Sequence, residues 1–164
     1  MDNWMSHMDK VMESLKTGAF LTVQNSDKVN TMTISWGYAG IMWNKPYFMA
    51  LVRKSRYTHT LIDSASSFTV SLPEKGSMAN ELKICGTKSG RDINKSEVVK
   101  FIPSEKVESP VVDGCTMYFE CEINFRQELN AANIPAEVME QHYGGNGEDV
   151  HELFFGEIVS YYKK

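Results

Sequence analysis

The sequence CTMYFECEINF, residues 115–125, alternates between two kinds of side chain. The apolar positions are Cys115, Met117, Phe119, Cys121, Ile123 and Phe125. A period of two residues predicts a long β-strand with one buried face. The turn sequence Val112-Asp113-Gly114 directly before it indicates an antiparallel neighbour. We therefore expect an antiparallel sheet built around this strand.

Shorter apolar and β-branched segments predict the other strands of the sheet. They are residues 19–24, 29–36, 46–52, 67–72 and 153–162. The last of these is apolar on both faces, which indicates a central strand or one covered by a partner.

Helical patterns are few and short. An amphipathic helix is expected over residues 4–15, closing at Gly18. Further helices are predicted at residues 60–65, 77–83 and 135–143, the last with Pro135 at its start. Six or seven strands with three or four helices favour a mainly β fold, a closed or split antiparallel β-barrel with a few short peripheral helices. No repeat or linker divides the sequence, so residues 1–164 are expected to form a single domain.

Charge and cysteine content narrow the class of protein. A net charge of −4 argues against a nucleic-acid or anionic-membrane binder, because such proteins need a broad basic face. No apolar run approaches the ~20 residues of a membrane span, and residues 1–7 do not have the pattern of a signal peptide. Cys115 and Cys121, expected on one strand, would lie ~20 Å apart, too far for a disulfide, and Cys85 belongs to no C-x-x-C motif. Free thiols in a cytoplasmic protein are therefore expected.

A basic turn follows the strand predicted at residues 46–52. Its sequence is RKSRYTH, residues 53–59, and a short helix is expected after it. Guanidinium groups, hydroxyls and free helix amides together form an environment that suits a phosphate group. We predict that the phosphate ligands are Arg53, Ser55, Arg56 and Thr58, whereas Lys54 alternates away into solvent. The alternative is a basic loop that contacts only solvent.

The sequence contains no recognisable metal site and no activated nucleophile. Its four histidines are scattered, and neither an H-E-x-x-H nor a G-x-S-x-G motif occurs. No metal is expected, and catalysis at this site would depend on a cofactor.

Three segments resemble the flavin reductase-like proteins of the FMN-binding split-barrel fold, which include flavoredoxin. Residues 30–36, NTMTISW, resemble the family strand that lies along the flavin. Residues 53–58 resemble the phosphate-binding turn, and residues 151–158, HELFFGEI, resemble the closing H-x-x-x-x-G-E strand. Cys85-Gly86 and Ser89-Gly90-Arg91-Asp92 add to the resemblance, which extends over residues 18–162.

The resemblance implies FMN as the cofactor. The implied cofactor-binding residues are Asn30, Thr31, Met32, Thr33, Ile34, Ser35, Trp36, Arg53, Ser55, Arg56, Thr58, Ser89 and Arg91. In this strand Thr31, Thr33 and Ser35 would form a row of hydroxyls opposite an apolar face, although an ordinary half-buried strand explains the alternation equally well. Trp36 would flank the flavin or belong to the core.

His151 and the loop at residues 88–91 are the other functional candidates. The resemblance implies a catalytic role for His151, which would orient nicotinamide or a proton near the flavin; the alternative is a surface or structural histidine. The loop would cover the site in its own subunit or reach a neighbouring one, and the alternative is an ordinary exposed loop. The resemblance also implies a homodimer with FMN near the interface.

The expected function is an FMN-binding oxidoreductase that transfers electrons from NAD(P)H to a flavin or protein acceptor. The alternatives are a flavoredoxin-like electron carrier and a non-catalytic split-barrel module that binds FMN, haem or another anionic ligand. Residues 36–43, WGYAGIMW, replace a serine- and threonine-rich run that short flavin reductases often hold. The aromatic side chains there can narrow or block substrate access.

Overall fold

A computed structural model describes residues 4–145 and 147–164 of the chain. Part of the N-terminal segment judged above for a signal peptide, residues 1–3, lies outside the described residues, as does Asn146.

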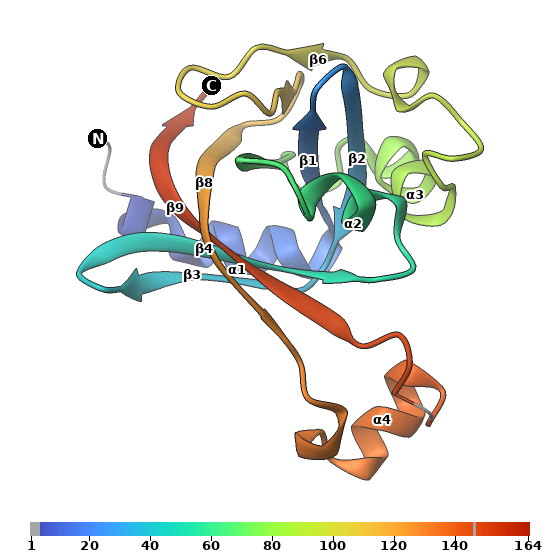
Figure 1. Cartoon of the computed structure of the whole chain (residues 1–164). Helices are drawn as coiled ribbons and strands as arrows, with labels where there is room; N and C mark the ends of the chain where they lie inside the picture. The colour runs from blue at the N-terminus through green and yellow to red at the C-terminus, as the bar shows by residue number, and fades with distance from the viewer. Residues whose placement is uncertain (1–3, 146) are drawn as a thin grey trace.

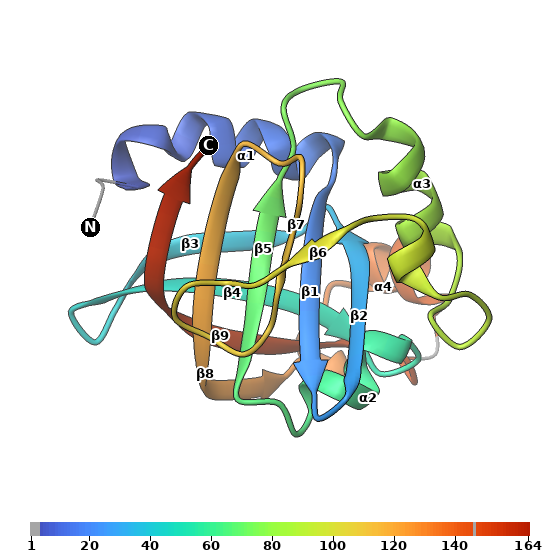
Figure 2. The same ribbon diagram turned by 90° about the horizontal axis from the view of Figure 1, so that it is seen from above.

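One antiparallel sheet of seven strands forms most of the fold. The strands are β1 (Ala19–Asn25), β2 (Lys28–Ile34), β3 (Gly37–Met42), β4 (Lys45–Arg53), β5 (Ser67–Leu72), β8 (Met117–Glu128) and β9 (His151–Lys163). Their order in the sheet is β2-β1-β5-β8-β9-β4-β3, which confirms that residues 153–162 belong to a central strand. The sheet is strongly curved (Figure 2). It is not closed into a barrel, because its two end strands, β2 and β3, do not pair with each other. The mainly β antiparallel prediction is confirmed.

The curvature of the sheet is concentrated in its two longest strands. The pairing of β8 with β9 shifts register between Glu120 and Cys121 and again between Ile123 and Phe125. An irregularity of this kind bends a strand and increases its twist. Figure 2 shows the result, with β1, β5 and β8 upright and β3 and β4 crossing behind them.

Short helices surround this sheet, as predicted. They are α1 (Met8–Thr17), α2 (Tyr57–Ile62), α3 (Ala79–Thr87) and α4 (Ala136–Tyr143), with 3₁₀ turns at Trp4–His7, Lys95–Glu97 and Ala131–Asn133. Helix α1 ends at Gly18, which has a φ of +118° that favours glycine. Pro135 caps the N-terminus of α4.

Several predicted boundaries were wrong. The strand expected to reach Trp36 ends at Ile34, and residues 37–42, read only as an aromatic run, form the edge strand β3. Helix α2 begins at Tyr57 rather than Thr60. Helix α3 covers residues 79–87 rather than 77–83. Edge strands with glycine and short helices have weak local patterns, so tertiary pairing decides where they begin and end.

Strand β8, predicted from the alternation at residues 115–125, is buried on both faces in its first half. Residues 117–121 are all buried, and only the following part of β8 has exposed positions. The reason is a second layer: β6 (Phe101–Ile102) and β7 (Val111–Val112) pair with each other over this face of the sheet (Figure 2). The two carboxylate oxygens of buried Glu120 accept hydrogen bonds from the backbone N–H groups of Glu105 and Lys106, each at 2.7 Å.

The cysteines are free and buried among the described residues. Cys115 precedes β8 instead of sharing it with Cys121, so the predicted common strand was wrong. No helix in the described part of the chain is long and apolar enough to cross a membrane.

Candidate functional site

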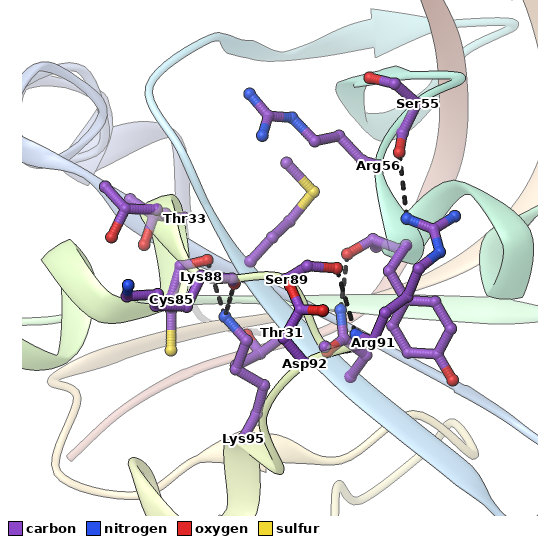
Figure 3. Close-up of a pocket in the computed structure, with 17 residues that line it drawn as sticks. Thr31, Thr33, Ser55, Arg56, Cys85, Lys88, Ser89, Arg91, Asp92 and Lys95 are labelled. Carbon is purple, nitrogen blue, oxygen red and sulfur yellow. Dashed lines mark hydrogen bonds between the residues drawn. The ribbon is translucent and has the colours of Figure 1, made fainter.

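Two adjoining cavities lie along strand β2. The first pocket, of about 220 Å³, lies between β2, the turn after β4 and the segment from the end of α3 to Lys95 (Figure 3). The second pocket, of about 170 Å³, lies between the end of β2 and the paired ends of β4 and β9. Met32, Thr33 and Arg56 line both pockets, so one elongated ligand can extend from one into the other.

All the predicted site residues line one or both of these pockets. Asn30, Thr31, Met32, Thr33, Ser55, Arg56, Thr58, Ser89 and Arg91 line the first pocket. Ile34, Ser35, Trp36, Arg53 and His151 line the second. Of the predicted phosphate ligands, Ser55 and Thr58 line only the first pocket, Arg53 lines only the second, and Arg56 lines both. The loop at residues 88–91 contributes to the first pocket within the same subunit.

The first pocket is strongly cationic. Its lining includes Arg56, Lys88, Arg91 and Lys95 against a single carboxylate, that of Asp92. The guanidinium of Arg91 donates to the backbone oxygen of Ser55 at 3.2 Å and lies 5.3 Å from the centre of the Tyr57 ring. The guanidinium of Arg56 makes no hydrogen bond or ion pair within residues 4–145 and 147–164 and extends over the pocket in Figure 3. An unpaired guanidinium beside other cations is a suitable donor for a bound anion.

Buried Lys95 shapes one wall of the first pocket. Its ammonium group donates to the backbone oxygens of Lys88 at 2.6 Å and Cys85 at 3.1 Å, near the C-terminal end of α3. Burial lowers the pKa of Lys95. These bonds hold the turn that follows α3 against the pocket, which makes Lys95 a structural cation rather than a free one.

Gly90 allows that turn to approach β2 closely. A Cβ atom at this position would lie 2.1 Å from Asn30 Oδ1 and 2.6 Å from the Tyr57 ring. The backbone there can therefore lie against the side chains that form the floor of the pocket only because residue 90 has none of its own.

The two threonine hydroxyls of the row predicted on β2 donate hydrogen bonds to backbone oxygens of the protein. Thr31 Oγ1 donates to the backbone oxygen of Leu21 at 3.1 Å, and Thr33 Oγ1 donates to that of Leu82 at 2.6 Å. Ser35 lies beyond the end of the strand. Because β2 is an end strand, its outer edge still carries backbone N–H and C=O groups outside the β ladder. These groups, rather than the hydroxyls, are suitable partners for a polar heterocycle.

Two of the predicted phosphate ligands, Ser55 and Thr58, form hydrogen bonds within the protein. The backbone N–H and the hydroxyl of Ser55 donate to the two carboxylate oxygens of Asp149, at 2.9 and 2.7 Å. Burial alone would raise the pKa of Asp149, but these bonds and the charge of Arg53 outweigh it and hold the pKa below its usual value. Thr58 Oγ1 accepts a hydrogen bond from Asn30 Nδ2 at 2.8 Å.

Arg53 stabilises the wall of the second pocket. Its guanidinium donates to the backbone oxygen of His142 at 2.6 Å, lies 5.1 Å from the centre of the Tyr143 ring and is 3.8 Å from a carboxylate oxygen of Asp149. These three partners belong to the segment between β8 and β9, far from Arg53 in the sequence. Its charge is therefore largely used to hold that segment in place.

His151 is a buried, neutral histidine at the start of β9. It lies opposite Arg53 in the pairing of β4 with β9, and its Nδ1 is 2.7 Å from the hydroxyl of Tyr143. Burial, with a contribution from the charge of Arg53, lowers the pKa of His151 to about 4. The ring of Trp36, which is 41% exposed, lies 5.1 Å from that of His151 at the mouth of the second pocket.

Three residues of the site, Tyr143, Asp149 and Lys95, have no local sequence pattern that predicts their roles. Each acts through burial or through a contact with a residue elsewhere in the sequence. Gly90 was noted only as part of a motif, and the close contact that requires it is visible in three dimensions alone. Within the described ranges, no group of three or more His, Cys, Asp or Glu side chains is arranged to hold a metal ion.

Comparison with known proteins gives a consistent family. A model of the flavin reductase-like domain matches residues 12–164. A protein of Archaeoglobus fulgidus without an assigned function is 30% identical over 106 residues, which cover 63% of this chain and 59% of that protein. The chain thus spans less than two thirds of this relative.

Solved structures share the fold. Flavoredoxin from Methanosarcina acetivorans superimposes with a TM-score of 0.71 at 24% identity, covering 90% of this chain and 68% of its own. An FMN-binding protein from Thermus thermophilus gives 0.71 at 20% identity, with coverages of 90% and 71%. An NADH:FAD oxidoreductase from Streptomyces globisporus gives 0.70 at 16% identity, with coverages of 96% and 85%. The likeness confirms the predicted split-barrel fold.

Proposed function

This chain belongs to the flavin reductase-like family, and from that premise we propose that it is an FMN-binding oxidoreductase. It would transfer electrons from NAD(P)H through FMN to a flavin or a redox-protein acceptor. Family membership supports flavin chemistry, and the residues of the two pockets support FMN as the flavin.

The observation that carries the proposal is the unpaired guanidinium of Arg56 between the two pockets. It would bind a phosphate in the first pocket, together with Arg91 and the hydroxyl of Ser89. A planar ring attached to that phosphate would then extend along the outer edge of β2 into the second pocket. The donors fit a phosphate dianion, and the unpaired edge of β2 fits the polar edge of a flavin ring.

When bound, FMN supplies the electron sink that accepts a hydride from NAD(P)H and passes the electrons on. The protein's part is to bind the phosphate, orient the ring and limit access of water. His151, which is neutral at physiological pH, would orient nicotinamide by a hydrogen bond rather than by charge.

A second candidate is a flavoredoxin-like electron carrier that another protein reduces. The exposed ring of Trp36 at the mouth of the second pocket supports it, because this ring narrows the approach to the space where nicotinamide would stack. A non-catalytic module that binds FMN, haem or another anion is the third reading.

An exposed aromatic surface supports the proposal of a homodimer. Tyr38, Ile41, Trp43 and Phe125 are exposed on β3, the following turn and β8. The ring centres of Trp43 and Phe125 are 6.0 Å apart, and Phe125 lies 5.2 Å from Phe155. An apolar surface of this kind is typical of a protein interface. We also propose a single FMN-binding domain and, from the free thiols, a cytoplasmic location.

Two measurements test the function. Titration of apo-protein with FMN should give a saturable change in flavin fluorescence at micromolar concentration, and the absence of one would contradict FMN binding. Anaerobic stopped-flow mixing of FMN-loaded protein with NADH and, separately, NADPH should then bleach the flavin. If dithionite bleaches it and neither nucleotide does, the carrier function is supported instead.

A further inference from the structure

The segment between β8 and β9 leaves the sheet and returns beside the second pocket. Figure 1 shows the two strands extending beyond the rest of the sheet towards α4. Met139 and Tyr143 of α4 pack with Val150 in a small hydrophobic cluster separate from the main core. This cluster fixes Tyr143 next to the first residue of β9, His151.

The contact between these two residues has a defined direction. Tyr143 Oη and His151 Nδ1 are 2.7 Å apart, and no other partner of this hydroxyl is found in the part of the chain that the structure describes. Burial raises the pKa of Tyr143, so the phenol keeps its hydrogen, and the neutral imidazole has one hydrogen as well. If Nδ1 carried that hydrogen and donated it to the tyrosine, the phenol hydrogen would have no acceptor inside the fold. The favoured arrangement is a tyrosine hydroxyl that donates to an unprotonated Nδ1.

The hydrogen of the imidazole then belongs on Nε2, on the other side of the ring. His151 lines the second pocket, whereas Tyr143 lies behind it and does not. Because the two ring nitrogens point in nearly opposite directions and Nδ1 contacts Tyr143, Nε2 lies on the side of the ring away from Tyr143. Among residues 4–145 and 147–164, Nε2 has no hydrogen-bond partner.

We propose that Tyr143 is a positioning residue that holds His151 in the tautomer with hydrogen on Nε2, so that the second pocket presents a neutral N–H donor. The donor suits a carbonyl oxygen of a ligand in that pocket, such as the carboxamide of a nicotinamide. The choice of nicotinamide as the ligand rests on the proposed function, whereas the inference of the tautomer does not.

The charges around His151 favour the neutral form of its ring, which the proposed tautomer requires. Arg53 and Arg56 and the imidazole of His142 all disfavour a second proton on His151, and only the carboxylate of Asp149 favours one. Arg53 also lies over the ring of Tyr143 at 5.1 Å, which holds the phenol in place from the β4 side. The charges therefore keep the imidazole neutral, and Arg53 keeps the phenol beside it.

Nitrogen-15 NMR of the histidine-labelled protein without flavin tests the tautomer directly. We expect the Nδ1 resonance of His151 in the unprotonated range and that of Nε2 in the protonated range, with His151→Gln used to assign them. In Tyr143→Phe the preference should fall by roughly two- to tenfold, the value of one neutral hydrogen bond, so that the two resonances move towards each other. Tyr118→Phe is the matched control, because Tyr118 is a buried tyrosine whose hydroxyl donates to the backbone oxygen of Cys115 at 2.6 Å.

The wild-type spectrum can overturn the proposal without any variant. Hydrogen on Nδ1 in the wild-type protein would contradict it, as would an unchanged tautomer ratio in a folded Tyr143→Phe variant. With FMN bound, Tyr143→Phe should raise the concentration of NADH or NADPH that gives half-maximal flavin reduction, while the affinity for FMN stays within about twofold. If the tautomer is as expected but neither nucleotide reduces the flavin, the proposed function fails and the role of Tyr143 stands.

Discussion

Arg53 and Arg56 stand three residues apart in one turn, yet the fold uses them in different ways. The guanidinium of Arg53 donates to the backbone oxygen of His142, lies over Tyr143 and approaches Asp149. The guanidinium of Arg56 has no such partner among the described residues and lines both pockets. One arginine builds the second pocket and the other is available to a ligand in the first. A basic motif thus gives the number of cations at a site but not the number that can bind an anion.

The largest expected effect concerns the neutral histidine behind Arg53. The pKa of His151 is about 4 in the folded protein and about 6.5 in the unfolded chain, so between these values only the unfolded chain binds the proton. The contribution of neutral His151 to the free energy of unfolding is therefore fully present above about pH 6.5. It is lost as the pH falls towards 4, which lowers the free energy of unfolding by about 3 kcal/mol. Urea unfolding at about pH 7.5 and about pH 4.5 should show a smaller pH dependence in His151→Gln than in the wild type. An unchanged pH dependence in His151→Gln would contradict the neutral state.

The available arginine should control affinity rather than stability. Removing a charge-assisted hydrogen bond costs about 1.5–3 kcal/mol, so Arg56→Ala should weaken FMN binding roughly 10- to 150-fold. Riboflavin has no phosphate, and its binding should change little. The free energy of unfolding should stay within about 0.5 kcal/mol, because the side chain is exposed and unpaired. Equal losses for FMN and riboflavin in a fluorescence titration would show that Arg56 does not contact the phosphate.

The engaged arginine should show the opposite behaviour. Arg53→Ala leaves the backbone oxygen of His142 without its donor and should lower the free energy of unfolding by about 1–3 kcal/mol. Urea denaturation of Arg53→Ala beside Arg56→Ala measures the contrast in one experiment. Equal stability of the two variants would contradict the division of roles between them.

A smaller effect is expected at the turn that closes the first pocket. Gly90→Ala places a Cβ against Asn30 and Tyr57 and should cost about 1 kcal/mol of stability as the turn moves away from β2. FMN affinity should fall as well, because Ser89 and Arg91 move with the turn. Gly40→Ala, at a position with open space around it, is the matched control. If both variants bind FMN equally well, the close approach at Gly90 does not shape the pocket.

Much of the architecture could be predicted because its signals are local. Residues 67–72 form a strand with the predicted bounds, and Gly18 ends the first helix as expected. The predicted strand at residues 29–36 was too long, because the chain turns at Ser35 and continues as the edge strand β3. The glycines of β3 weaken the local pattern by which a strand is predicted. The burial of the second face of β8 could not be predicted. The residues that cover this face belong to the segment 101–112, which has no strong pattern of its own.

Local patterns and motifs in the chain predict which segments contribute residues to the site along β2. Alternation sets the strands, and the motifs at residues 30–36, 53–58 and 151–158 lie on elements that the topology brings together. Which of these groups still have a free donor or acceptor depends on contacts formed in the folded protein. Hydrogen-bond partners such as Leu21 and Leu82 for the β2 threonines, or His142 for Arg53, come from other parts of the chain. A polar group is available to a ligand only when no such partner satisfies it, and satisfaction is a property of three-dimensional contact rather than of local sequence.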